Sequence, residues 1–228
     1  MTLSFQGHLT RWQKRYGDAL LTMLTCLLLL LMFVVAPLQA AGVGVVQDFG
    51  FVVALLMIAG ALVVSGSPAA FAVMLVAFGM YAWAIVRRLH GASNLDISLV
   101  AGAWLLLAAA LGWVVVRAVF GPGRINYHRV IGAVLLYLLI ALAFVALFAF
   151  VGLLIPNAFS GIALQDSPAL TSNLIYFSFV TLTSTGYGDI VPMHPIARSL
   201  CNLETVIGQL YPATVLARLV TLQLAHKA

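Results

Sequence analysis

The residues best suited to chemistry form one polar, glycine-rich stretch in a very apolar chain, Thr181-Leu-Thr-Ser-Thr-Gly-Tyr-Gly-Asp-Ile-Val-Pro192. Its hydroxyl groups and backbone carbonyls are oxygen ligands, which can replace the water shell of a cation in a narrow passage. Gly186 and Gly188 allow consecutive carbonyls to point the same way, because glycine adopts backbone angles that other L-residues resist. The preceding run, residues 170–180, is too short and too polar to cross a bilayer. The stretch therefore predicts a ladder of oxygen atoms for a dehydrated cation.

The composition indicates an integral membrane protein. The chain has 228 residues, of which 64% are hydrophobic and 7% charged, and its mean hydropathy is +1.12. Soluble domains carry about a quarter charged residues. The net charge of +5 is spread over helix ends, which is typical of topology signals rather than of a nucleic-acid surface. We expect membrane lipid as the surroundings, location in the cell membrane, and neither a cofactor nor a soluble substrate.

Six apolar segments predict six membrane-spanning helices in an all-α fold, at about 19–36, 49–64, 69–86, 97–120, 130–155 and 195–224. The first is longer than the 7–15 or so residues of a signal-peptide core, which favours a retained helix over a cleaved signal. The segments suggest four parts: an amphipathic cytoplasmic N-terminus (1–18), a four-helix transmembrane domain (19–120), a Gly-, Pro- and Arg-containing linker (121–129) and a pore domain (130–228).

The distribution of basic residues predicts that both chain ends are cytoplasmic. With six spans, the cytoplasmic side would hold eight of the 11 Lys and Arg residues, and the outer side only three. Cytoplasmic segments are richer in Lys and Arg than outer ones, so the count agrees with this orientation. The neighbouring Arg87 and Arg88 on the outer side are an exception to the rule.

The sequence Thr183-Ser-Thr-Gly-Tyr-Gly-Asp189 closely resembles the signature of the potassium channel superfamily, and Leu174-Ile-Tyr-Phe-Ser-Phe-Val-Thr-Leu-Thr183 resembles its pore helix. The resemblance covers roughly residues 130–220, a helix, pore loop and helix unit. It implies a re-entrant pore helix and a selectivity filter at 184–188, as in bacterial six-helix channels. It also implies a homotetramer, because each chain supplies one loop and a ring needs four.

The resemblance also implies roles for individual residues. Potassium would be held by carbonyl oxygens of Ser184, Thr185, Gly186, Tyr187 and Gly188, the first four being its main ligands. Ser184 stands where the family usually has threonine, and Thr185 where it usually has valine or isoleucine. The expected supports around the filter are Thr183 at its base, the aromatic rings of Tyr176 and Phe177 behind Tyr187, and Asp189 at the outer mouth, hydrogen-bonded to the same aromatic layer.

The last apolar segment contains the candidates for pore lining and gating. Asn202, Thr205 and Gln209 fall at i, i+3 and i+7, so they share one helix face, either lining a wet pore or bonding to another helix. Glu204, the only glutamate, is expected either to attract cations or to brace the pore helix from behind. Gly208 falls at the family's hinge position, where close packing is the alternative explanation, and Pro212 adds a second place to bend.

The leading hypothesis is a potassium-selective channel that is not steeply voltage-gated. Voltage sensing needs several arginines along the fourth helix, and residues 99–116 contain none. A weakly selective cation channel and a non-conducting scaffold or regulatory subunit are the alternatives. An enzyme is not expected, because the spans lack paired carboxylates, a metal-ligand cluster and a nucleophile with a histidine partner.

Overall fold

The computed structural model describes residues 20–43, 53, 56, 59–60, 67–88, 90–91, 93–120 and 127–224. Within these residues the chain is helical apart from loops, one two-stranded ladder and a single π-helical turn. The predicted amphipathic segment at 1–18 lies outside the described residues, as does most of the predicted second span at 49–64.

The first helix runs from Leu20 to Ala40 and continues past Pro37, where the sequence predicts an end. It contains a π-helical turn, η1 (Leu31–Val35), followed by α2 (Ala36–Ala40). The Ala36 amide donates to the Leu31 carbonyl five residues back, so this turn is wider than an α-helical one. A proline ring clashes with the carbonyl four residues before it in a regular helix. The wider turn gives that ring room, which explains why the helix does not stop at Pro37.

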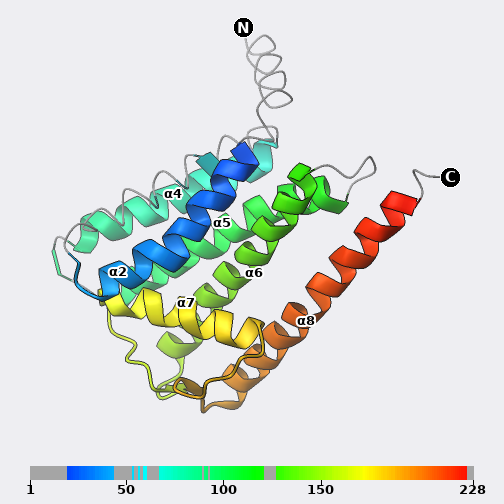
Figure 1. The fold of residues 1–228 in the computed structure, drawn as a ribbon. Coiled ribbons are helices and arrows are strands. Elements are labelled where there is room, and N and C mark those ends of the chain that lie inside the picture. Colours follow the sequence, from blue (N-terminus) through cyan, green and yellow to red (C-terminus); the bar gives the residue numbers. More distant parts are fainter. Residues whose placement is uncertain are drawn as a thin grey trace, which may run out of the picture.

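Three long helices form the body of the molecule: α4 (Pro68–Arg88), α5 (Asn94–Phe120) and α6 (Tyr127–Leu154). The middle helix, α5, packs along both of the others (Figure 1). Fully buried leucines of α5 and α6, including Leu107, Leu111, Leu135 and Leu142, belong to the hydrophobic core. Small residues such as Ala77, Ala103 and Ala141 are also fully buried, so the helices approach closely.

A shorter helix, α7 (Pro168–Leu182), runs at a steep angle to α6 and α8 near one end of the molecule (Figure 1). It contacts α2, α6 and α8. The helix expected over Leu174–Thr183 is present and begins earlier: the extended Ser167 is the N-cap and Pro168 opens the first turn. At 1.5 Å per residue, its 15 residues reach about 22 Å. This is shorter than a hydrocarbon core of roughly 30 Å.

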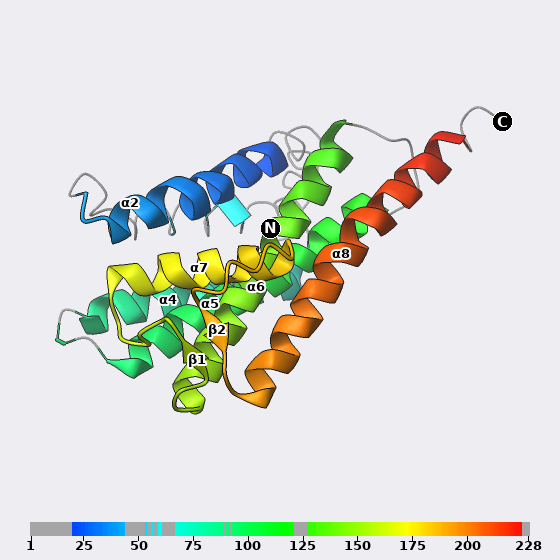
Figure 2. The same cartoon turned by 60° about the horizontal axis from the view of Figure 1, so that its bottom comes forward.

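The last helix, α8 (Pro195–Leu224), has the bounds that the sequence predicts. It packs against α6 and α7 as far as Tyr211, whose hydroxyl donates to the Ala133 carbonyl, and its last turns stand away from the other helices (Figure 1). Between α6 and α8, β1 (Phe159–Ser160) pairs antiparallel with β2 (Val191–Pro192), and Phe159 lies opposite Pro192 (Figure 2). The ladder joins the loop before α7 to the segment that follows it.

The described residues contain four helices long and apolar enough to cross a membrane: Leu20–Ala40, Pro68–Arg88, Asn94–Arg117 and Val130–Leu154. The chain is therefore a multi-pass membrane protein. Helix α8 is not among the four, and it carries Arg198, Glu204 and Arg218. Its 30 residues nevertheless reach about 45 Å, which exceeds the thickness of the hydrocarbon core.

Candidate functional site

The chain leaves α7 with an alternating backbone. Ser184 (φ +58°), Gly186 (φ +59°) and Gly188 (φ +82°) are left-handed, whereas Thr185 and Tyr187 between them are not. In an extended strand successive carbonyls point to opposite sides, and this alternation turns them toward a common side. The left-handed region costs a non-glycine residue roughly 1–2 kcal/mol, so the angle of Ser184 needs support from its surroundings. The sequence indicates the two glycines, but it gives no sign that Ser184 is left-handed too.

That support comes from the last turn of α7. The Ser184 amide donates to the Thr181 carbonyl at 3.0 Å, and the Thr185 amide donates to the Val180 carbonyl at 2.9 Å. The Gly186 amide also points to the Val180 carbonyl, at 3.3 Å. The first half of the oxygen ladder is thus bonded directly to the end of α7, and a movement of this helix must move the ladder.

Hydroxyl groups surround the base of the ladder. The Thr183 hydroxyl donates to the Phe179 carbonyl at 2.7 Å and lies 2.8 Å from the Thr185 hydroxyl. From α8, the Gln209 amide donates to the Ser184 hydroxyl at 2.9 Å, and the Thr205 hydroxyl donates to the Thr181 carbonyl at 3.2 Å. Two members of the predicted polar face on α8 therefore contact the base of the ladder. Asn202, the third member, is exposed.

Two tyrosines and an aspartate form the other end of the site. The rings of Tyr176 and Tyr187 are parallel within 5°, with centroids 6.2 Å apart. The Tyr176 hydroxyl donates to the Asp189 carboxylate at 2.9 Å, as the sequence predicts for this aromatic layer. Phe177 lies elsewhere: its ring packs against Phe148 and Phe159, with centroids 4.8 and 5.5 Å away. It therefore supports the segment around β1 rather than Tyr187.

The mouth of the ladder is braced by a glycine contact between segments that are distant in the sequence. A Cβ atom on Gly161 would lie 2.0 Å from the Asp189 carbonyl oxygen, and Gly161 has a φ of +85°. Only glycine fits this approach without a shift of the backbone. Next to it, the Met193 amide donates to the Ala158 carbonyl at 2.8 Å. Gly161 is the single glycine between Pro156 and Pro168, which is the one signal in the sequence.

Glu204 is fully buried and faces α7 and α6. The Ser178 hydroxyl on α7 lies 2.5 Å from Glu204 Oε1, to which it donates, and 3.1 Å from the Ala141 carbonyl on α6. Glu204 Oε2 has no hydrogen-bond partner within the part of the chain that the structure describes. Of the two roles considered for Glu204, this position favours bracing the short helix from behind. Ser178 completes the contact, and no signal in the sequence marks this serine.

Gly208 marks the closest approach of α8 to α7. A Cβ atom at Gly208 would lie 1.9 Å from the Leu182 carbonyl oxygen, which is backbone and cannot rotate away. This contact gives the glycine a packing role, and its predicted role as a hinge stays a prediction. Pro212 lies inside α8, which continues past it to Leu224.

The pair Arg87 and Arg88, exceptional in the charge distribution, is neutralised by ion pairs. Arg87 Nε lies 3.0 Å from Asp96, whose side chain is fully buried, and Arg87 also donates to the Ser93 hydroxyl at 2.8 Å. Arg88 pairs with Asp166, 78 residues further along the chain. Because the rule counts Lys and Arg and gives acidic residues little weight, the two arginines remain an exception to the predicted orientation.

The geometry defines a class of protein: a membrane protein with an ordered oxygen ladder at the end of a short helix that lies between two long ones. A family model described as an ion channel matches residues 133–223, less than half of the chain, from α6 to α8. This part of the chain is therefore an ion channel domain. The matched family is one of ion channels and not of enzymes, in agreement with the prediction from sequence. No curated protein and no solved structure matches the chain.

Proposed function

We propose that four copies of this chain form a potassium-selective channel that conducts passively through the carbonyl oxygens of residues 184–188. The observation that carries the proposal is the alternation of left-handed Ser184, Gly186 and Gly188 directly after α7. Carbonyl oxygens turned toward a common axis can replace the hydration shell of a potassium ion. Potassium is the permeant ion and needs no other cofactor.

The direction of α7 adds an electrostatic reason for cations. The C-terminal end of a helix carries a partial negative charge, and α7 ends at Leu182, next to the base of the ladder. A cation near Ser184 is stabilised by this end of the helix, and an anion is repelled. The exposed side chains of Asn202 and Gln209 suit a water-filled cavity below the ladder, which is where a hydrated ion would wait.

The proposed arrangement in the membrane has six spans, with both chain ends in the cytoplasm and Asp189 at the outer mouth. Helices α6 and α8 enclose the pore helix α7 in each chain, and the first four helices lie outside the pore. Tetramerisation follows from the ladder, because one chain offers oxygen atoms on one side of an ion only. Residues 183–189 are all exposed in the single chain, as an axis shared by four copies requires.

The test is ion flux into liposomes that contain the purified protein. The wild-type protein is expected to give potassium flux that barium blocks, and Gly186→Ala is expected to abolish it with the oligomer intact. Nothing lies within 4 Å of a Cβ atom at Gly186, so this variant acts through the left-handed backbone angle rather than through a clash.

Gly79→Ala in α4 is the matched control, because its Cβ atom also meets nothing within 4 Å and its backbone is helical. Unchanged flux in Gly186→Ala would contradict conduction through this ladder. Absence of flux from the wild-type protein would instead support a scaffold or regulatory subunit.

The specific alternative is a weakly selective cation channel, which Ser184 and Thr185 favour because both depart from the usual residues at these positions. Reversal potentials in mixed potassium and sodium distinguish the two. A potential that follows the potassium gradient supports selectivity, and one near zero in symmetric total cation contradicts it.

A further inference from the structure

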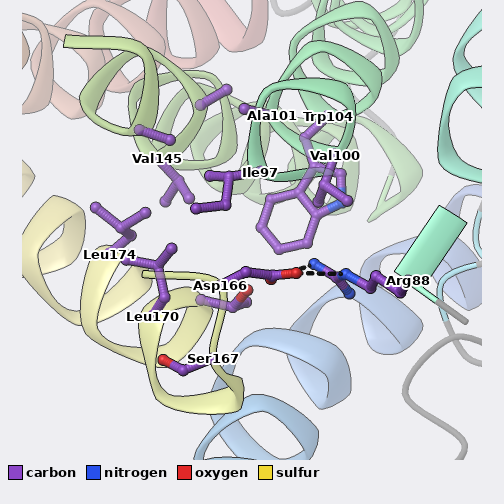
Figure 3. A pocket seen from close by; sticks show the side chains of 13 residues that line it. Arg88, Ile97, Val100, Ala101, Trp104, Val145, Asp166, Ser167, Leu170 and Leu174 are labelled. Carbon is purple, nitrogen blue, oxygen red and sulfur yellow. Dashed lines mark hydrogen bonds and ion pairs between the residues drawn. The ribbon is translucent and has the colours of Figure 1, made fainter. Parts of the chain in front are cut away.

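Besides apolar contacts from the first helix and α5, a bidentate ion pair connects the outer helices to the start of α7. Arg88, the last residue of α4, places Nη2 2.7 Å and Nε 3.0 Å from the two carboxylate oxygens of Asp166 (Figure 3). The Asp166 side chain is 11% exposed and that of Arg88 is 41% exposed, so the pair is partly shielded from water. Two parallel bonds fix the orientation as well as the distance, unlike a single-point contact.

Asp166 precedes the first residue of α7 by two positions. Negative charge is stabilised at the N-terminal end of a helix, so this site favours a carboxylate even before Arg88 is considered. Asp166 thus interacts with the start of α7 on one side and with the end of α4 on the other. The four-helix domain therefore holds the pore helix at the end opposite the ladder.

Behind the ion pair, the packing around the start of α7 leaves one small cavity. A cavity of about 30 Å³ lies between α5, α6 and α7, lined mainly by apolar side chains that include Ile97, Trp104, Val145, Leu170 and Leu174 (Figure 3). Close-packed contacts resist displacement, and a void removes part of that resistance. The ion pair adds a directional contact to the apolar packing at this end of the helix.

The other end of α7 is fixed to the ladder, because its last carbonyls accept hydrogen bonds from the amides of Ser184, Thr185 and Gly186. Helix α7 is a single straight element of 15 residues without an internal proline or glycine. A shift at Asp166 is therefore transmitted along the helix to the backbone of the ladder.

From this geometry we infer that Arg88 is a positioning residue for the ladder, and that the four-helix domain controls ion conduction by holding Asp166. This inference rests on the proposed function for its electrical readout. It gives the first four helices, which contain no arginine-rich sensor, a mechanical role: they set the position of the pore helix. Loss of the pair is expected to lower the open probability and to leave the unitary conductance unchanged, because the oxygen ligands themselves are retained.

Single-channel recordings of Arg88→Gln, Asp166→Asn and the double variant, with Arg88→Lys as the conservative change, test this. Each single variant should lower the open probability roughly five-fold or more, the lower end of typical coupling between two sites. The double variant should be no worse than either single one, since the two residues act through one contact. Arg88→Lys keeps the charge but loses the two parallel hydrogen bonds of the guanidinium group, so its open probability should lie between those of wild type and Arg88→Gln.

Arg87→Gln is the matched control, because it breaks the neighbouring ion pair with Asp96, within the four-helix domain and without contact to α7. It is expected to lower thermal stability and to leave the open probability unchanged. Equal effects of Arg87→Gln and Arg88→Gln, or a wild-type open probability in Arg88→Gln, would overturn the inference.

Hydrogen exchange provides a readout that needs no current. In Arg88→Gln the amides of Thr185 and Gly186 should exchange faster than in wild type, while Arg87→Gln leaves them unchanged. Failure of wild-type flux would count against the proposed function alone. Unchanged exchange of both amides in Arg88→Gln would count against the positioning role, whether or not the protein conducts.

Discussion

At the scale of single residues, the buried carboxyl of Glu204 connects three helices. It lies on α8, accepts a hydrogen bond from Ser178 on α7, and shares that hydroxyl with the Ala141 carbonyl on α6. A buried polar group without a hydrogen-bond partner is energetically costly. Among the described residues, the Ser178 hydroxyl is the hydrogen-bond partner of this carboxyl. The contact lies behind the pore helix, away from the exposed face with Asn202 and Gln209. Glu204 is therefore expected to act on the position of α7 and not on ions directly.

Removing one member of this contact should be worse than removing both. We expect Ser178→Ala to reduce the free energy of unfolding by about 1–3 kcal/mol, since it leaves a buried carboxyl unpaired. The double variant Ser178→Ala with Glu204→Leu should recover most of the loss, because two apolar groups need no partner. Thermal unfolding of the purified protein measures both effects.

Glu204→Gln keeps the volume and an acceptor oxygen, and it separates bracing from ion attraction. We expect potassium selectivity and unitary conductance to be retained, with a change in open probability. A reduced unitary conductance with unchanged thermal stability would show that Glu204 acts on the permeating ion instead. Single-channel recordings beside thermal unfolding distinguish these outcomes.

At the scale of helices, Gly208 decides how closely α8 approaches α7. Gly208→Ala places a Cβ atom against the Leu182 carbonyl, so the two helices must separate. Overpacking of this kind typically costs about 1–3 kcal/mol. We expect a lower melting temperature together with reduced current, measured on the same preparation. A change in open probability without loss of stability would favour the hinge role, and Gly79→Ala in α4 controls for the substitution itself.

The helices were largely predictable from sequence because each carries a local signal. Ser167 and Pro168 mark the start of α7, and α8 begins at Pro195 as expected. The end of the first helix was not predictable, because no residue type indicates the π-helical turn that precedes Pro37.

Contacts around the ladder were predicted where their residues are neighbours in the chain. The ladder, Tyr176 behind Tyr187, and Asp189 beside Tyr176 all lie within 14 residues. Contacts between distant segments were missed: Gly161 against Asp189, Ser178 against Glu204, and Arg88 with Asp166. Phe177 was assigned to the wrong neighbours for the same reason, since its partners Phe148 and Phe159 come from α6 and β1. Pairings across the fold require the relative placement of helices, which periodicity alone does not give.

At the scale of the whole molecule, the oxygen ladder lies on the surface of the single chain. Tyr187 is 72% exposed even though its ring stacks on Tyr176, and the residues from Thr183 to Asp189 all lie at the surface. The last turns of α8, beyond the contact of Tyr211 with α6, are largely exposed, with Leu216 65% exposed. Both features are expected of a subunit whose neighbours complete the axis.

Potassium should therefore stabilise the assembled tetramer and not the single chain. An ion bound by oxygen atoms from four copies favours the assembled state by mass action, by about 2.7 kcal/mol when its concentration is 100 times the dissociation constant. We expect the tetramer to dissociate at a lower temperature when potassium is replaced by sodium at equal ionic strength. Native mass spectrometry along a temperature ramp measures this directly.

Gly186→Ala should reduce this difference between the two ions, because it alters the backbone that presents the oxygen atoms, whereas Gly79→Ala should preserve it. Equal dissociation temperatures in potassium and sodium for the wild-type tetramer would contradict selective binding between the four chains. A stable assembly of another size would contradict the four-fold ladder itself, since the spacing of the oxygen atoms around the ion is set by the number of chains that surround it.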